Sequence, residues 1–218
     1  MDPYLKRLLL LTSGLILASV AGIARYRFID GRYKPFVGYV VLGLLFEVIS
    51  YLYALQYQSN IAPTNVFILL ELLILNYLFT TWSDSNESRK WCYGSAVFFC
   101  LFFIGSLIKV GIDKHLIYFN VLCRFYLLML ATGSLAQRVV RMECPYYRDL
   151  VFIICCGVIL YFSNRIIIES FWFYGLQKSS FFRIGLFAVQ QWINIFVNLM
   201  YLYAILWIPK KPAYLTFS

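Results

Sequence analysis

The chain has 218 residues, of which 62% are hydrophobic, 20% aromatic and only 13% charged, with a formal net charge of +9. Soluble domains carry about 45–50% apolar and about 25% charged residues, so this composition excludes a chain with a water-facing surface. It also excludes intrinsic disorder, which requires low hydrophobicity and high charge. The composition therefore predicts an integral membrane protein that crosses the bilayer several times.

Apolar segments predict the membrane-spanning helices, because a helix needs about 20 mostly apolar residues to cross the hydrocarbon core. Seven segments qualify, and they predict an all-α protein: a single domain over residues 1–218 that forms a bundle of seven transmembrane helices. In chain order the predicted spans are 5–24, 36–57, 62–82, 91–112, 116–137, 149–174 and 181–207. The first segment lacks a small-x-small cleavage site followed by a soluble chain, so we interpret it as a span and not as a signal peptide.

The distribution of Lys and Arg predicts the orientation of the bundle. Six basic residues lie on the side of the N-terminus and eleven on the other side, while Arg124 and Arg165 lie within spans. Because cytoplasmic loops are enriched in basic residues, we expect the N-terminus outside and the C-terminus in the cytoplasm, in a plasma or inner membrane. The positive charge then favours contact with anionic lipids of the bilayer. No basic face stands outside the membrane, so nucleic acid is not expected as a partner.

The second and third predicted helices each carry a carboxyl group near the centre of the span, Glu47 and Glu71. An ionisable side chain in a span costs about 2.5–3.5 kcal/mol on insertion scales, which makes each one a functional candidate. The helices are joined by the short segment 58–61, so they are antiparallel neighbours and their carboxyls can face one interior space. Two like charges in a low dielectric would keep one of these carboxyls protonated.

The third predicted helix carries polar side chains on two different faces. Asn65 and Asn76 are eleven residues, or three turns, apart and therefore lie on one face. Glu71 points away from that face by about 120–140°. This arrangement predicts a helix with neighbours on two sides, in the middle of the bundle.

Polar residues also share faces in the later helices. Asn120 and Arg124 are four residues apart, as are Arg165 and Glu169, and Asn164 adjoins the second pair. The spacing of Arg165 and Glu169 predicts an ion pair within one helix. In the last helix, amides recur every three or four residues at Gln190 or Gln191, Asn194 and Asn198. Such a stripe must face the bundle interior or water, because unpaired polar groups are costly in lipid.

Two interpretations of these polar residues remain open. Amides between membrane helices often serve only to hold helices together, at about 0.6 kcal/mol each, which would suit a purely structural subunit. However, three Glu and two Arg sum to −1 when all are ionised, so at least one carboxylate has no basic partner within the spans. A membrane carboxyl that exchanges a proton is suited to a proton relay or to a cation or amine site.

We therefore predict a polar cavity, open outward, that binds a small ligand or ion in a sensor or regulatory subunit. Because the connections are short, its output would pass to a membrane or cytoplasmic protein partner. The alternative is a small transporter or channel that uses the same residues as a path, which requires polarity to continue to the cytoplasmic side. The candidate ligand-binding or path residues are Glu47, Glu71, Asn120, Arg124, Asn164, Arg165, Glu169, Gln190, Gln191, Asn194 and Asn198.

Enzyme chemistry is not indicated by these patterns. A retinal protein would need a lysine in the last helix, and residues 181–207 contain none. The only histidine, His115, lies at a predicted helix end, and no Asp lies in the interior of a span, so intramembrane protease pairs are missing. We expect no catalytic residues, no metal and no cofactor.

Overall fold

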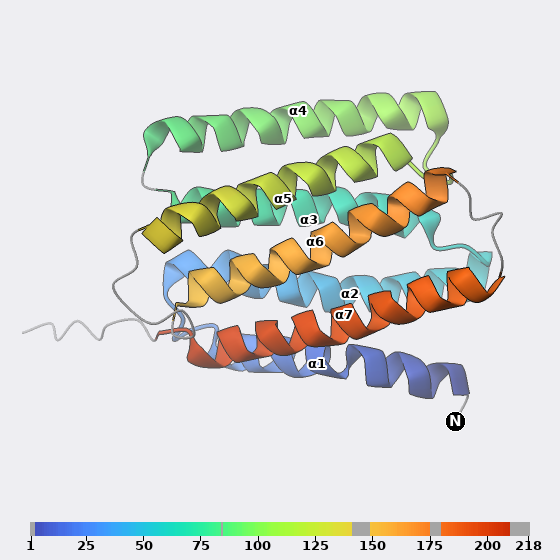
Figure 1. Cartoon of the computed structure of the whole chain (residues 1–218), viewed down its shortest axis with the longest axis horizontal. Coiled ribbons are helices and arrows are strands. Elements are labelled where there is room, and N and C mark those ends of the chain that lie inside the picture. Colours follow the sequence, from blue (N-terminus) through green and yellow to red (C-terminus); the bar gives the residue numbers. More distant parts are fainter. Residues whose placement is uncertain (1–2, 84, 141–148, 175–179, 210–218) are drawn as a thin grey trace, which may run out of the picture.

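The protein is a bundle of long helices. The computed structural model describes residues 3–83, 85–140, 149–174 and 180–209, and within them all regular structure is helical. A short 3-10 turn, η1 (Gly31–Tyr33), precedes the second helix. The seven α-helices of the described residues are α1 (Pro3–Arg25), α2 (Lys34–Tyr57), α3 (Ile61–Trp82), α4 (Asn86–Val110), α5 (Ile117–Val140), α6 (Leu150–Tyr174) and α7 (Ser180–Trp207). Six of them, α2 to α7, are long and apolar enough to cross a membrane (Figure 1).

The helix ends lie within three residues of the predicted spans, with one exception. Helix α4 begins at Asn86, whereas its predicted span begins at residue 91. The difference has a simple cause, because the first turn of α4 is polar and hydropathy detects only the part of a helix that suits lipid. Typical start and stop residues mark these helix ends: a proline lies in the first turn of α2, and Gly111, at φ 90°, ends α4.

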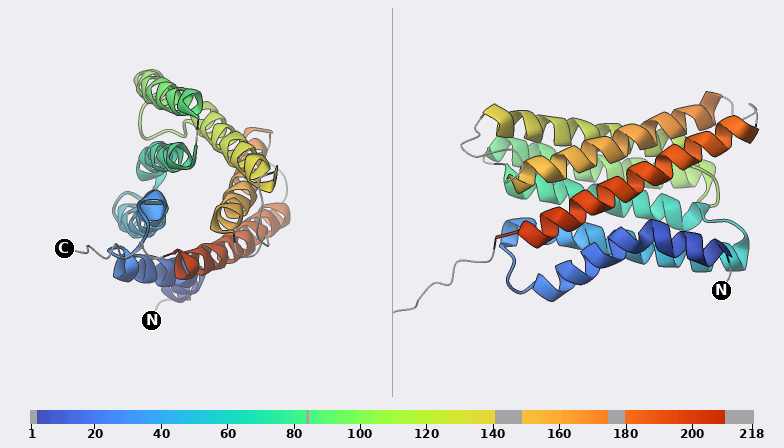
Figure 2. Two further views of the ribbon diagram at one scale, coloured as in Figure 1. Left: turned by 90° about the vertical axis from the view of Figure 1, so that its left-hand side faces the viewer. Right: turned by 60° about the horizontal axis from the view of Figure 1, so that its bottom comes forward.

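Six of the helices form a closed ring. Each packs against the next in the order α1, α2, α3, α5, α6, α7 and back to α1. Viewed along the helices, the ring surrounds a common centre (Figure 2, left). Helix α4 is left out of the ring and packs on the outside against α3 and α5. The chain therefore places α3 beside α5 although α4 separates them in sequence.

Helix α1 closes the ring beside α7. The Arg25 guanidinium at the end of α1 donates hydrogen bonds to two of the last carbonyls of α7, those of Ile205 (2.7 Å) and Leu206, and to the carbonyl of Ile208 (3.1 Å) just after the helix. The last carbonyls of a helix have no partner within it, so a cation placed there satisfies them and complements the helix dipole. Because both helices end at this contact, α1 and α7 run parallel.

Helix α4 is attached to α3 by the two asparagines that share a face of α3. The Asn76 amide donates to the Cys92 carbonyl of α4 at 2.6 Å, and the Tyr126 hydroxyl of α5 donates to the Asn76 side-chain oxygen at 3.0 Å. The Asn65 amide donates to the carbonyls of Ile112 and Lys114, at 2.8 and 2.9 Å, in the segment between α4 and α5. These two side chains hold helices together, while Glu71 of the same helix points into the ring.

Candidate functional site

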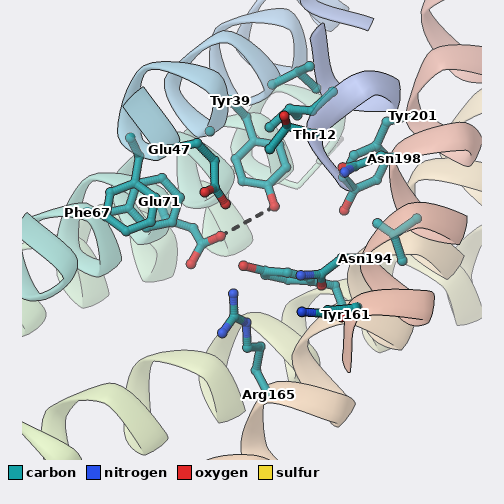
Figure 3. A pocket seen from close by; sticks show the side chains of 16 residues that line it. Thr12, Tyr39, Glu47, Phe67, Glu71, Tyr161, Arg165, Asn194, Asn198 and Tyr201 are labelled. Carbon is teal, nitrogen blue, oxygen red and sulfur yellow. Dashed lines mark hydrogen bonds between the residues drawn. The ribbon is translucent and has the colours of Figure 1, made fainter. Parts of the chain in front are cut away.

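A cavity of about 150 Å³ lies inside the ring, between α1, α2, α3, α6 and α7 (Figure 3). One buried water needs about 10–15 Å³ by this kind of measure, so the space suits about ten waters or one small organic molecule. Its wall combines apolar residues such as Leu15, Phe46 and Phe67 with many polar side chains. The polar lining is Thr12, Tyr39, Glu47, Glu71, Tyr161, Arg165, Gln191, Asn194, Asn198 and Tyr201.

Both central carboxyl groups face this cavity, as the short connection between α2 and α3 predicted. Glu71 of α3 is buried, with 2% of its surface exposed, and the Tyr39 hydroxyl of α2 donates to its Oε1 at 3.3 Å. Glu47 of α2 is half-buried on the same wall. Two carboxyl groups from adjacent helices therefore share one space of low dielectric.

Arg165 of α6 enters the cavity from the opposite side. Its guanidinium points toward Glu71 in Figure 3 and interacts electrostatically with both Glu71 and Glu47. Its charged carbon lies 5.3 Å from the centroid of the Tyr161 ring, one turn before it on α6. The wall thus presents two carboxyls and one guanidinium, with aromatic rings beside them.

The predicted ion pair between Arg165 and Glu169 is wrong. Glu169 pairs instead with Arg124 of α5, with Arg124 Nη1 and Glu169 Oε1 2.5 Å apart. Spacing of four residues places two side chains on one side of a helix, but it does not fix which neighbouring helix each one meets. Here Arg165 points into the ring and Glu169 points to α5.

The amide stripe of α7 lies on the cavity wall. Gln191, Asn194 and Asn198 line the cavity, and Tyr201 continues the same face one turn later. This resolves the sequence alternative in favour of Gln191, because Gln190 is buried away from the wall. The stripe therefore faces the ring interior, as the cost of unpaired amides in lipid predicted.

Three buried polar atoms of the cavity wall have no hydrogen-bond partner among the described residues: Tyr201 Oη, Asn194 Oδ1 and Arg165 Nε. Buried polar groups in native proteins are nearly always hydrogen-bonded, and each exception calls for an explanation. Since all three belong to residues that line one cavity, water or a ligand in that cavity is the simplest partner for them.

The other candidate residues lie elsewhere. Asn120 and Arg124 are buried one turn apart on α5, where Arg124 pairs with Glu169, and neither lines the cavity. Asn164 of α6 faces a shallow apolar pocket between α6 and α7. The structure therefore divides most of the predicted set into a cavity group from α2, α3, α6 and α7 and a second polar cluster at the contact of α5 and α6, while Asn164 and Gln190 belong to neither.

The cavity is closed toward the end of the ring where α1 and α7 finish. The rings of Tyr39 and Phe36 pack edge-on against Tyr201, with centroids 5.8 and 5.3 Å apart. Beyond this aromatic layer, the residues that follow Tyr201 on the same face are apolar and fully buried, with no measurable exposure at Ala204 and Ile205 and 1% at Ile208. Asn76, which could have extended polarity to this end, is bonded to α4.

Two tyrosines of the wall, Tyr39 and Tyr161, were not predicted from the sequence, although a signal for them exists. Tyr39 lies four and eight residues before Gly43 and Glu47, which both line the cavity, and Tyr161 lies four residues before Arg165. These spacings place them on the same helix faces as the charged groups. In a chain so rich in aromatic residues, a tyrosine on such a face is not distinguishable from one that packs in the core or at the membrane interface.

No model of a protein family, no curated protein and no solved structure matches this chain. The chemistry of the cavity is therefore the basis on which a function can be proposed.

Proposed function

We propose that the protein is a seven-span membrane protein, with its N-terminus outside and its C-terminus cytoplasmic, whose cavity binds a small polar ligand or an ion. Helix α1 is the seventh span in this proposal. Its length of 23 residues and its parallel course beside α7 support that assignment. The excess of basic residues at the opposite ends of the helices from the N-terminus supports the orientation.

The observation that carries the proposal is the convergence of charged and unpartnered polar side chains from separate helices on one cavity. Glu47, Glu71 and Arg165 are expensive to place in a membrane, and structural neutralisation alone would need them paired in close contacts. Arg124 and Glu169 meet that requirement, because they form a direct ion pair. The cavity group does not, and it surrounds a space large enough for a ligand.

The closed end favours a binding protein over an open channel. A path that continues along α7 would need polar groups past Tyr39 and Tyr201, whereas Ala204 and Ile205 are apolar and fully buried. A ligand bound by five helices of one ring alters their packing, and a membrane or cytoplasmic partner can respond to that change. The protein is accordingly proposed to be a sensor or regulatory subunit.

A thermal-unfolding screen of the purified protein in lipid nanodiscs tests the binding function. The panel contains alkali cations, ammonium compounds, carboxylic acids and zwitterionic amino acids, each at matched ionic strength. At least one class is expected to raise the unfolding temperature of the wild type, since a ligand that binds only the folded state stabilises it. The effect should disappear in Glu47→Gln or Glu71→Gln and persist in Glu87→Gln, a change at an exposed glutamate of α4.

A flux assay in proteoliposomes separates binding from transport. The solute that stabilises the protein is loaded outside the vesicles, and no uptake above that of empty vesicles is expected. Saturable uptake that Glu47→Gln abolishes would make the protein a transporter. Absence of stabilisation by every class, in a well-folded wild type, would show that the carboxyls are structural and that the protein is an assembly subunit.

A further inference from the structure

We infer that the ligand of the cavity is a small organic cation whose ammonium group is held by Glu47. This inference rests on the proposed binding function and specifies the class of ligand. Three observations support it: the pairing of the buried charges, the polar atoms of the cavity wall that have no hydrogen-bond partner, and the volume of the cavity.

The buried charges alternate in sign across the bundle and leave one carboxylate in excess. Glu169 is in direct contact with Arg124, at 2.5 Å. Glu71 interacts electrostatically with Arg124 and Arg165 and accepts a hydrogen bond from Tyr39. Glu47, at the end of this series, has only the more distant influence of Arg165, and no cation of the described residues lies within 4.0 Å of its carboxylate. Glu47 is therefore the carboxyl group of the cavity that has no close cationic partner among the described residues.

Two of the three unpartnered atoms of the cavity wall can accept a hydrogen bond. Asn194 Oδ1 accepts hydrogen bonds only, and the Tyr201 hydroxyl can accept one; both are buried without a partner, and Tyr201 is 3% exposed with its hydroxyl directed into the cavity (Figure 3). The Tyr201 hydroxyl can also donate, and the other unpartnered donor among the described wall residues is Arg165 Nε. A ligand that brings N–H or O–H donors and a positive charge complements this set, whereas a carboxylate ligand would face the carboxyl groups of Glu47 and Glu71.

The size and aromatic character of the wall favour an organic cation over a bare ion. A single dehydrated metal ion needs several oxygen ligands at about 2.0–2.6 Å, and the cavity has about ten times the volume of one water. Phe46 and Phe67 stack beside the two glutamates with ring centroids 4.1 Å apart, and the Tyr161 ring lies opposite them. Aromatic faces attract ammonium groups, as do carboxylates.

A matched pair of probes tests the charge requirement. Choline and dimethylbutanol, its neutral carbon analogue, have nearly the same shape and hydroxyl group, so they differ in charge alone. Ethylammonium and tetramethylammonium extend the cation series, and sodium acetate reports on an anion site at Arg165. Each probe is titrated against thermal unfolding of the wild type, Glu47→Gln and the exposed-site control Glu87→Gln in nanodiscs at constant ionic strength.

At least one ammonium probe is expected to raise the unfolding temperature by about 3–6 °C at ten times its Kd, while dimethylbutanol has no effect at the same concentration. Glu47→Gln should weaken the effect at least tenfold, and Glu87→Gln should leave it unchanged. If Glu47→Gln does not fold, Glu47→Asp keeps the charge and should retain a weaker response to the same cation.

Three results would overturn the inference, and they bear differently on the proposed function. Equal stabilisation by choline and dimethylbutanol would show that charge is not recognised. Stabilisation by acetate that Arg165→Gln abolishes, without any response to ammonium probes, would assign an anion to the cavity and leave the binding function standing. A folded wild type that responds to no member of the wider panel would reject both proposals.

Discussion

At the scale of single residues, the bundle separates paired charges from charges that face a cavity. Arg124 and Glu169 make a direct contact, with 6% and 16% of their side chains exposed. In a low-dielectric setting, removal of one partner leaves an uncompensated charge, whereas removal of both costs much less. The same reasoning applies to polar groups without charge, since an unpartnered buried hydroxyl costs stability and a bonded one contributes to it.

A double-mutant cycle tests which arginine is the partner of Glu169. Glu169→Gln should lower the free energy of unfolding by about 3–5 kcal/mol, and the double change with Arg124→Gln should recover part of that loss. The matched cycle with Arg165→Gln should be additive. Denaturant titrations in mixed micelles measure both cycles. Coupling to Arg165 in place of Arg124 would show that Glu169 pairs within α6.

Two tyrosine substitutions of the same kind should have opposite effects. Tyr201→Phe removes a buried hydroxyl without a partner, so it should raise the free energy of unfolding by about 1 kcal/mol. Tyr39→Phe removes the donor to Glu71 and should lower it by about 1–3 kcal/mol, because the acceptor is charged or strongly polar. Thermal unfolding without ligand measures both. A destabilised Tyr201→Phe would reveal a protein partner for that hydroxyl.

At the scale of helices, the bilayer allows the helix ends to be predicted from the sequence but does not specify which helices pack against each other. Lipid imposes length and hydropathy on each span, so the predicted helix ends lie within three residues of the observed ones except at the polar start of α4. Nothing in hydropathy specifies that α3 packs beside α5 or that α4 stays outside the ring. For the same reason Glu47, Glu71 and the α7 amides were placed correctly toward the interior, whereas the partner of Glu169 was not.

The contact of α6 with α7 depends on a glycine beside the closed end of the cavity. A Cβ at Gly157 would lie 2.7 Å from Tyr201 Cε1, and the Tyr201 ring is confined by Phe36 and Tyr39. Gly157→Ala should therefore lower the free energy of unfolding by about 1–3 kcal/mol. Gly105→Ala on α4, where a Cβ meets nothing within 4 Å, is the matched control and should be neutral or stabilising. Equal effects of the two substitutions on thermal unfolding would mean that the Tyr201 side chain can move aside at no cost in stability.

At the scale of the whole molecule, the ring is asymmetric along its axis. The middle of the bundle holds the cavity and its charged residues, while aromatic rings and apolar side chains close the cavity along the last turns of α7. Under the proposed orientation this closed end is cytoplasmic, and we propose that the cavity opens to the outside. An inward signal then travels through helix packing and not through passage of the ligand.

Cysteine labelling of α7 in intact cells tests this central claim most directly. In a variant without the six native cysteines, Asn194→Cys should react with a membrane-impermeant thiosulfonate added outside. Phe196 lies at a similar depth but on the outside of the bundle, where 57% of its surface is exposed. Phe196→Cys should not react, because a thiol surrounded by lipid does not ionise to the reactive thiolate. Ala204→Cys, buried beyond the aromatic layer, should stay unlabelled from either side. Labelling of Asn194→Cys only from the cytoplasmic side, or labelling of Ala204→Cys as fast as Asn194→Cys, would contradict an outward cavity with a closed inner end.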